Sequence, residues 1–246
     1  MKRAVSSLVF AIPVLLSLQS CGGDLHFGDV SPGLYLLSYE RSRPAGRAII
    51  TGDIMVEVDE KGGVDFVLHD LVLGSTFGTG NIDDRGNFTA TSGSSVTGFR
   101  GDPTVTIEGR VRGSGENASV EATVSGDIDA DVSGTYYSDG QTSPWVADYD
   151  GNLTGSLSGI LDIDVFSDGT LTSSLGVGDD FFTGSGTVSS VGFGTINLTL
   201  APGRQGDELT LYGYFYIHEG VQYASGTYEG TVDGSSVNGN WTAERD

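Results

Sequence analysis

The sequence has one cysteine, six prolines and few basic residues among its 246 positions. Because Cys21 is the only thiol, the chain can form no internal disulfide, and its stability must come from a packed core. Twelve Lys and Arg residues stand against 33 Asp and Glu, and so acidic a chain is excluded from binding nucleic acid by phosphate neutralisation. After Cys21, apolar residues never recur at helical spacing over three turns, which argues against a helical fold.

The N-terminus has the order of an export signal. Met1-Lys2-Arg3 is basic, the mainly apolar stretch from Ala4 to Leu18 is too short to cross a bilayer, and small residues follow. Leu18-Gln19-Ser20-Cys21 resembles the lipobox of bacterial lipoproteins. The resemblance implies that residues 1–20 are a cleaved signal peptide. It also implies that the Cys21 thiol carries a diacylglyceryl group and that the new amino terminus is acylated.

The same resemblance implies a place in the cell envelope. Residues 21–32 would form the lipid anchor and a tether, and the 11 residues from Gly22 to Pro32 reach at most about 36 Å. Gly22 stands where many inner-membrane lipoproteins have aspartate, which favours the outer membrane and leaves the leaflet open. Loss of Lys2 and Arg3 with the signal leaves ten basic against 33 acidic residues, a formal charge of −23. Anionic headgroups should repel this chain, so the acyl chains must hold it at the membrane.

Alternation of apolar and polar residues predicts antiparallel strands through the mature region. Ile54, Met55, Val56 and Val58 occur among Asp53, Glu57 and Asp59, and a glycine-containing turn follows. Asp150-Gly151, Asp168-Gly169 and Asp233-Gly234 are dipeptides typical of hairpin turns, because both residues tolerate positive φ. The 39 glycines lie between alternating apolar positions rather than in low-complexity runs, so they indicate strands and turns instead of disorder.

The chain also repeats itself. Val105–Val111 matches Leu209–Phe215 at an offset of 104, and Val132–Tyr136 matches Val237–Trp241 at an offset of 105. Similar matches link Phe77–Ile82 with Thr183–Val188 and Gly52–Val58 with Gly159–Val165, in the same order. The period is too long for a solenoid. We therefore predict an all-β, antiparallel meander, internally duplicated into two barrel- or sandwich-like halves at residues 33–141 and 142–246. One larger continuous β-barrel or sandwich is the alternative.

Alignment of the halves separates the two faces of one strand. Val120, Ala122 and Val124 align with Ala224, Gly226 and Tyr228, whereas their sequence neighbours are mainly Ser, Thr, Glu and Tyr. Since side chains alternate along a strand, the first set should face the core and the second the solvent. Tyr136 and Trp241 align with the core set, so we expect both to be structural.

Calcium is a possible ligand of so acidic a chain, since it prefers oxygen ligands. Asp127-Ile128-Asp129-Ala130-Asp131 starts like an EF-hand loop but has Val132 and Ser138 where glycine and glutamate are needed. Asp83, Asp84, Asp179 and Asp180 are weak calcium candidates. Acidic residues at turns are commonly explained by bonds to nearby backbone N–H groups, so we predict no resident metal or cofactor.

Catalytic signatures are missing from the sequence. His26, His69 and His218 lack metal or triad spacing, and Gly155-Ser156-Leu157-Ser158-Gly159 lacks the central serine of a nucleophile elbow. His69 and His218 read as residues near strand ends. We predict that the protein is not an enzyme.

Tyrosines form the most specific surface feature. Tyr212, Tyr214 and Tyr216 should project from one side of a strand, beside Tyr223 on the next. Amphipathic rings on a sheet can stack on sugars or anchor a protein partner, so these four tyrosines are a candidate recognition face. The competing interpretation, which we favour, is that the other half or the segment near Trp145 covers them, because large aromatic patches are rarely left exposed.

The glycine-punctuated hairpins and the terminal strand with Gly239 and Trp241 resemble the small barrels of surface lipoproteins of the transferrin-binding type. The resemblance concerns fold texture and transfers no binding residues. Three functions follow: a non-enzymatic envelope protein that binds or scaffolds a protein partner or glycan, a small-ligand carrier with a cavity in a barrel, and a glycan hydrolase. An exposed tyrosine strip over a filled interior favours the first, an internal cavity the second, and a groove with two nearby carboxylates the third.

Overall fold

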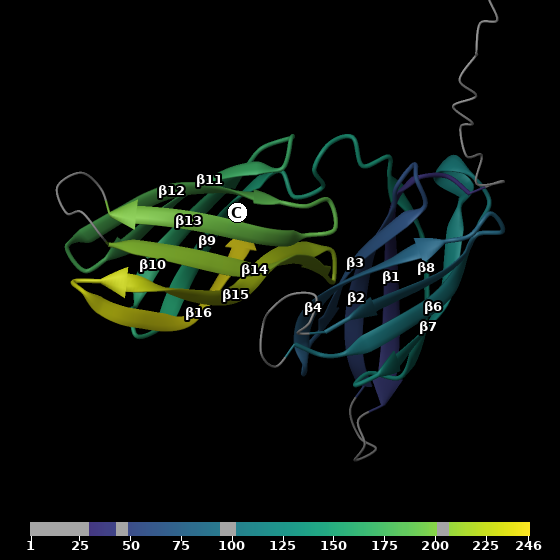
Figure 1. Ribbon diagram of the computed structural model, residues 1–246, viewed down its shortest axis with the longest axis horizontal. Helices are drawn as coiled ribbons and strands as arrows, with labels where there is room; N and C mark the ends of the chain where they lie inside the picture. The colour runs from purple at the N-terminus through teal and green to yellow at the C-terminus, as the bar shows by residue number, and fades with distance from the viewer. Residues whose placement is uncertain (1–29, 43–48, 94–101, 201–206) are drawn as a thin grey trace, which may run out of the picture.

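The computed structural model describes residues 30–42, 49–93, 102–200 and 207–246. These residues form two closed antiparallel barrels of eight strands each (Figure 1). The first barrel contains β1 (Gly33–Ser42), β2 (Ile49–Val58), β3 (Gly63–Asp70), β4 (Gly74–Ile82), β5 (Asn87–Ser92), β6 (Val105–Arg112), a short 3₁₀ turn (Gly115–Asn117), β7 (Ser119–Gly126) and β8 (Ala130–Ser138). Residues 1–20 and Cys21 lie outside the described residues, so the signal peptide and lipid anchor remain predictions.

The second barrel repeats the same plan. It contains β9 (Ala147–Gly155), β10 (Gly159–Val165), β11 (Thr170–Val177), β12 (Asp180–Val188), β13 (Phe193–Leu200), β14 (Glu208–His218), β15 (Val221–Val232) and β16 (Ser235–Arg245). Each barrel is a meander closed by pairing of its first and last strands, β1 with β8 and β9 with β16. The predicted all-β class and its two barrel-like halves are therefore confirmed, and the alternative of one larger barrel is wrong.

The internal sequence matches fall on equivalent strands. Val105–Val111 lies in β6 and Leu209–Phe215 in β14, the sixth strand of each barrel. Val132–Tyr136 lies in β8 and Val237–Trp241 in β16, the closing strand of each. The residues that matched at a nearly constant offset thus occupy the same place in two copies of one fold.

Two of the three predicted hairpin turns are correct. Gly169 (φ 78°) lies between β10 and β11, and Asp233-Gly234 joins β15 to β16 with φ of 50° and 72°, as a type I′ turn requires. Asp150-Gly151 is not a turn: it lies inside β9, where Gly151 pairs with Ala243 of β16. A Cβ at Gly151 would collide with the β16 backbone, so this glycine permits a close strand approach instead of a reversal.

Alternating side chains fill both barrels. Tyr35 and Phe66 are fully buried in the core of the first barrel, and Tyr228 and Phe182 in that of the second. The alignment of the halves placed Val120, Val124, Tyr228 and Trp241 on the inner face, and all four are buried. Tyr136 packs its ring edge-on to Tyr35, with 5.7 Å between centroids. Large rings and branched side chains therefore occupy the interiors in which a carrier would need a cavity.

One end of the second barrel lies against the side of the first (Figure 1). Leu34, Met55 and Val67 point outward from the first barrel, yet they are buried because they join the core of the second. Trp145, on the segment between the barrels, is fully buried in this cluster and its Nε1 donates to the carbonyls of Ser189 and Ser190. This apolar contact fixes the two barrels as one unit. Among the described residues there is no helix with the length and apolar character of a membrane span.

Candidate functional site

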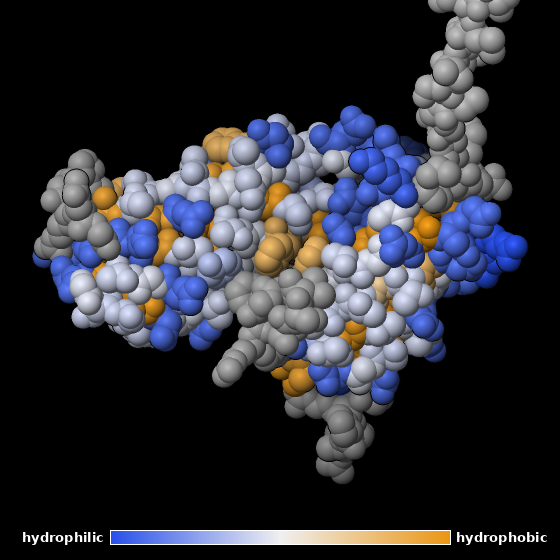
Figure 2. Space-filling view, viewed as in Figure 1, coloured by the Kyte–Doolittle hydropathy of each residue, from blue (hydrophilic) through white to orange (hydrophobic). Residues whose placement is uncertain are grey.

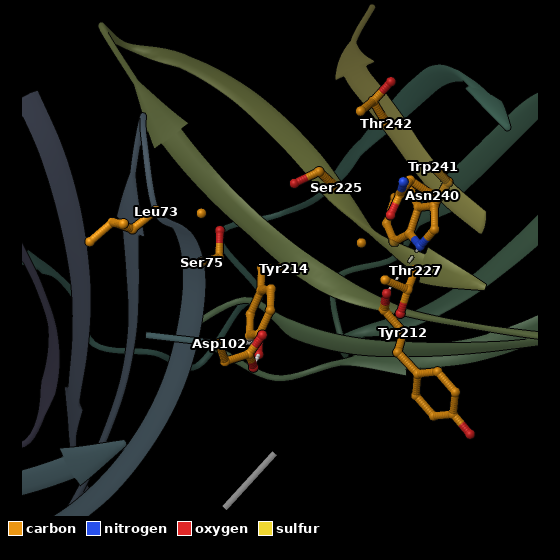
Figure 3. Close-up of a pocket in the computed structure, with 12 residues that line it drawn as sticks. Leu73, Ser75, Asp102, Tyr212, Tyr214, Ser225, Thr227, Asn240, Trp241 and Thr242 are labelled. Atoms are coloured by element: carbon orange, nitrogen blue, oxygen red, sulfur yellow. Dashed lines mark hydrogen bonds between the residues drawn. The ribbon is translucent and has the colours of Figure 1, made fainter. Parts of the chain in front are cut away.

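A crevice of about 420 Å³ lies between the barrels (Figure 3). Its floor is the outer face of β14, β15 and β16, and one wall comes from the first barrel. The floor residues are Tyr212, Tyr214, Ser225, Gly226, Thr227, Asn240, Trp241 and Thr242, and the wall residues are Leu73, Gly74, Ser75 and Asp102. This volume is typical of small-ligand sites, so the crevice is the candidate functional site.

Strand register arranges the floor as two rows. Tyr212 pairs with Thr227, which pairs with Asn240. Tyr214 pairs with Ser225, which pairs with Thr242. Because paired residues point to the same side and neighbouring strands are about 4.8 Å apart, the six side chains form a grid of hydroxyl and amide groups. Thr227, Asn240 and Thr242 are exposed.

Between these two rows, a third row of paired residues faces the interior of the barrel and supports the floor. Gly213 pairs with Gly226, which pairs with Trp241, and the Trp241 ring turns into the barrel. A Cβ on Gly213 would collide with that ring, and the Trp241 Nε1 donates to the Tyr212 carbonyl at 3.0 Å. The glycines let the indole pack directly beneath the strands. Trp241 was predicted to be structural, and its burial agrees.

The wall is tied to the floor by a hydrogen bond between the barrels. The Tyr214 hydroxyl donates to Asp102 Oδ2 at 2.6 Å (Figure 3). Farther into the interface, Phe77 stacks on Phe193 with 5.2 Å between centroids, and the Ser190 hydroxyl donates to the Glu57 carboxylate. Figure 2 shows apolar surface gathered where the barrels meet. The crevice is thus bounded by a packed, partly polar interface.

An apolar turn forms the rim of the crevice. Leu71, Val72 and Leu73, between β3 and β4, are 51%, 52% and 41% exposed. Their backbone is held by Asp70, whose Oδ1 accepts the N–H groups of Val72 and Leu73 at 2.9 Å each. Exposed apolar side chains on a fixed turn can contact a ligand or partner without losing chain entropy on binding.

Asp70 itself is buried and fully bonded. Its carboxylate also accepts the Tyr39 hydroxyl at 2.8 Å and the Arg41 guanidinium through Nε and Nη2 at 3.0 Å each. Burial alone would raise the pKa of Asp70, but the N–H groups of Leu73 and Val72, with Tyr39 and Arg41, hold that pKa below its usual value. The carboxylate therefore stays ionised and keeps the turn in place.

Beyond Tyr214 on β14, Tyr216 and His218 form a cluster of rings with His69 of β3. His69 of β3 stacks on Tyr216 at 3.5 Å between centroids and 12° between planes, and its Nδ1 lies 2.8 Å from the Ser75 hydroxyl. His218 lies 6.5 Å from His69, and its Nδ1 is 3.5 Å from an Asp53 oxygen. Burial, with His218 nearby, lowers the pKa of His69 to about 4. His69 and His218 were predicted only as residues near strand ends; both also join the barrels.

A second groove, of about 360 Å³, adjoins this cluster. Its lining includes His218 and the carboxylates of Glu40, Asp53, Asp131 and Glu219. Burial raises the pKa of Asp53, although the nearby His218 opposes the shift.

The four candidate tyrosines do not form one exposed face. Tyr214 is only 6% exposed and bonds Asp102 of the first barrel, and Tyr216 is covered by His69. Tyr223 stacks on Tyr216 at 5.8 Å. Tyr212 is half-buried, and Figure 3 shows its ring directed away from the other crevice side chains. The first barrel covers the middle of the strip because β14 packs against β2 and β3, as the covered interpretation expected. Tyr212 and Tyr214 remain as lining residues of the crevice.

The candidate calcium residues lie apart, at turns of different barrels. Asp83 and Asp84 lie between β4 and β5, and Asp179 and Asp180 where β11 turns into β12. The Asp83 carboxylate is occupied by its own turn, since it accepts the backbone N–H groups of Arg85 and Asn87. Within the ranges that the structure describes, no group of three or more His, Cys, Asp or Glu side chains could hold a metal ion.

Sequence reasoning did not identify the wall of the crevice. Asp102 precedes β6, Leu73 lies in the β3–β4 turn and Ser75 near the start of β4, all far in sequence from β14. The only local signal is the apolar triplet at residues 71–73, which continues past the end of a strand into a turn, where polar residues are usual.

No protein-family model matches this chain, and no curated protein matches it. Similar solved structures include a mutant of the vaccine antigen transferrin-binding protein B from Haemophilus parasuis, at 9% identity and a TM-score of 0.29, over 87% of this chain and 76% of that one. A DUF3598-family protein of unknown function from Nostoc punctiforme is 11% identical, with a TM-score of 0.24, over 87% and 95%. Kievitone hydratase from Nectria haematococca is 9% identical, with a TM-score of 0.26, over 87% and 88%. These similarities assign neither an activity nor a site, so function must be argued from the residues of the crevice.

Proposed function

We propose that this protein is a lipid-anchored, non-enzymatic cell-envelope protein that binds a protein partner or glycan in the crevice between its barrels. The observation that carries the proposal is the grid of hydroxyl and amide groups on β14–β16, facing a wall from the other barrel. A concave site with convergent polar groups is the usual form of a specific binding site. The site needs both barrels, which gives the duplicated fold a functional reason.

The position of the crevice relative to the predicted anchor supports binding in the envelope. In a meander, alternate turns lie at the same end of the barrel. The β3–β4 turn and the segment before β6 are therefore at the end of the first barrel opposite Gly33, where the chain arrives from the predicted tether. If Cys21 carries the lipid, the crevice wall lies on the end of the barrel that points away from the membrane, where a ligand has access.

The other two functions have less support. A carrier would need space inside a barrel, and both interiors are filled by large buried side chains such as Tyr35, Phe66 and Phe182. A glycan hydrolase would need a pair of carboxylates, and the crevice lining contains one, Asp102. The second groove has four carboxylates, so incubation with glycans should be checked for released reducing ends. We expect none.

The binding proposal is tested by blocking the crevice. Asn240 and Asn238 are both exposed on the outer face of β16, but only Asn240 lines the crevice. Full-length lipidated protein in detergent micelles should bind an isolated envelope fraction, and Asn240→Trp should abolish this binding because the indole fills the floor. The matched variant Asn238→Trp should bind like the wild type. Equal binding by all three proteins would rule out the crevice as the site.

The anchor is tested separately. Metabolic labelling with palmitate should mark the wild-type protein and leave Cys21→Ser unlabelled, because Cys21 is the only thiol and the expected acylation site. Cell fractionation should then find the wild-type protein with the outer membrane. A labelled Cys21→Ser variant, or an unlabelled wild type, would contradict the anchor.

A further inference from the structure

We propose that the ligand of the crevice is an uncharged glycan, whose hydroxyl groups are bound by the grid of β14–β16 and by Asp102. This inference deepens the proposed function and depends on it, because it names the chemical class that the same site accepts.

The lining has the hydrogen-bonding character that a sugar requires. The grid offers the hydroxyls of Ser225, Thr227 and Thr242, each able to donate and to accept, and the Asn240 amide, which does both with separate atoms. Groups at about 4.8 Å intervals across strands present many contacts to a ligand that carries hydroxyls in several directions. An apolar peptide side chain would leave these polar groups without water or partner on burial, which is unfavourable.

The charge of the crevice and of the whole chain favours uncharged glycans over anionic ones. Asp102 is the one ionisable acid in the lining, and none of the lining residues that the structure describes is Lys, Arg or His. The mature chain carries a formal charge of −23 after loss of residues 1–20. A phosphate- or uronate-bearing glycan would enter a negative field without a cation to bind it, so anionic glycans are disfavoured.

Asp102 is placed to accept from a neutral ligand. Its Oδ2 accepts the Tyr214 hydroxyl at 2.6 Å, which orients the carboxylate at the wall of the crevice. A charged acceptor forms stronger hydrogen bonds with hydroxyl donors than a neutral one does. Leu73, on the braced rim, adds apolar surface at 41% exposure against which the C–H groups of a sugar can pack.

The test uses a glycan array with neutral, acidic and free-amine glycans, probed with the full-length lipidated protein in micelles. The wild type should bind neutral glycans. Asn240→Ala should weaken this binding about tenfold, the usual effect of one lost hydrogen-bonding side chain, and the matched Asn238→Ala should not. Asp102→Asn keeps an acceptor for Tyr214 and removes the charge, so neutral binding should fall by less than about tenfold.

Other outcomes overturn the inference. Binding restricted to acidic glycans, to amine-bearing glycans or to envelope protein, with no neutral glycan bound, would refute the ligand class. Loss of binding in Asp102→Asn as complete as in Asn240→Trp would indicate a cationic ligand instead. The proposed function is tested separately, because it depends only on whether Asn240→Trp abolishes binding to the envelope fraction. As a control, the thermal unfolding midpoint of each variant is measured. An unchanged midpoint shows that the fold is intact.

Discussion

Asp70 is the residue on which the shape of the crevice rim depends. Its buried carboxylate joins Tyr39 and Arg41 to the backbone of the apolar turn. Asp70→Ala leaves a partly buried guanidinium and a buried hydroxyl without their acceptor, and removal of one partner from such a network costs about 3 kcal/mol of unfolding free energy. Chemical denaturation measures this loss, and hydrogen exchange at Val72 and Leu73 should accelerate.

The matched control is Asp84→Ala. Asp84 is an exposed turn residue of the same barrel, so its removal should change stability by no more than about 0.5 kcal/mol. Similar stability for the two variants would show that the Asp70 network does not hold the rim.

His69 makes the contact between the barrels sensitive to pH. Its pKa is lowered to about 4 in the folded protein, against an ordinary value of 6.5, so the unfolded chain binds the proton more readily. The stabilisation is complete above pH 6.5 and is lost as pH falls from 6.5 toward 4. At pH 4.5 the loss from this group should be about 2 to 3 kcal/mol.

The measurement compares unfolding free energies at pH 7 and pH 4.5 in the wild type and His69→Phe. The phenyl ring can keep the stack on Tyr216 but binds no proton. Other groups, among them Asp53 and Asp70, titrate in both proteins, so the difference between the two curves isolates His69. Parallel curves would mean that His69 titrates normally.

At the scale of the strand, glycines that lie inside strands rather than in turns mark places where neighbouring backbones approach closely. Gly184 points into the second barrel from β12, and a Cβ there would collide with the Asn197 carbonyl on β13. Gly176, on the neighbouring β11, pairs with Phe181 and has open space where a Cβ would lie. Gly184→Ala should therefore destabilise the protein by about 1 to 3 kcal/mol, whereas Gly176→Ala should be neutral or up to about 1 kcal/mol stabilising.

Denaturant unfolding of both variants decides this prediction. A neutral Gly184→Ala would show that β12 and β13 can separate to admit a methyl group, and that the inward glycines are not needed for barrel closure.

Much of the element-level structure could be predicted because it depends on local patterns. Alternation of side chains gave the strands, and the offset of 104 to 105 residues gave the duplication, since equivalent strands must satisfy the same inside and outside rule. The predicted turn at Asp150-Gly151 was wrong because a turn and a close strand contact both favour glycine. Local sequence does not distinguish these two uses.

At the scale of the molecule, the parts that could not be predicted depend on how the two barrels meet. Met55 and Val67 looked like ordinary strand residues, yet they point outward and are buried against the second barrel. Alternation placed Tyr214 on the outer face, and the cover that we favoured comes from the first barrel, but the sequence did not identify its partner there. Asp102 becomes a crevice residue only through its bond to a strand more than a hundred residues later. The site is therefore a property of the barrel–barrel contact, whose local signal is limited to the apolar triplet at residues 71–73.

Hydrogen-exchange mass spectrometry of the full-length lipidated protein, with and without a saturating envelope ligand, tests the central claim most directly. A ligand seated between the barrels should slow exchange in segments 72–76, 211–215, 224–228 and 239–243, which line the crevice from both barrels. Segment 159–165 of β10, which contributes no lining residue, should be unaffected. Protection confined to one barrel, or centred away from these segments, would contradict a binding site built from the contact of two duplicated barrels.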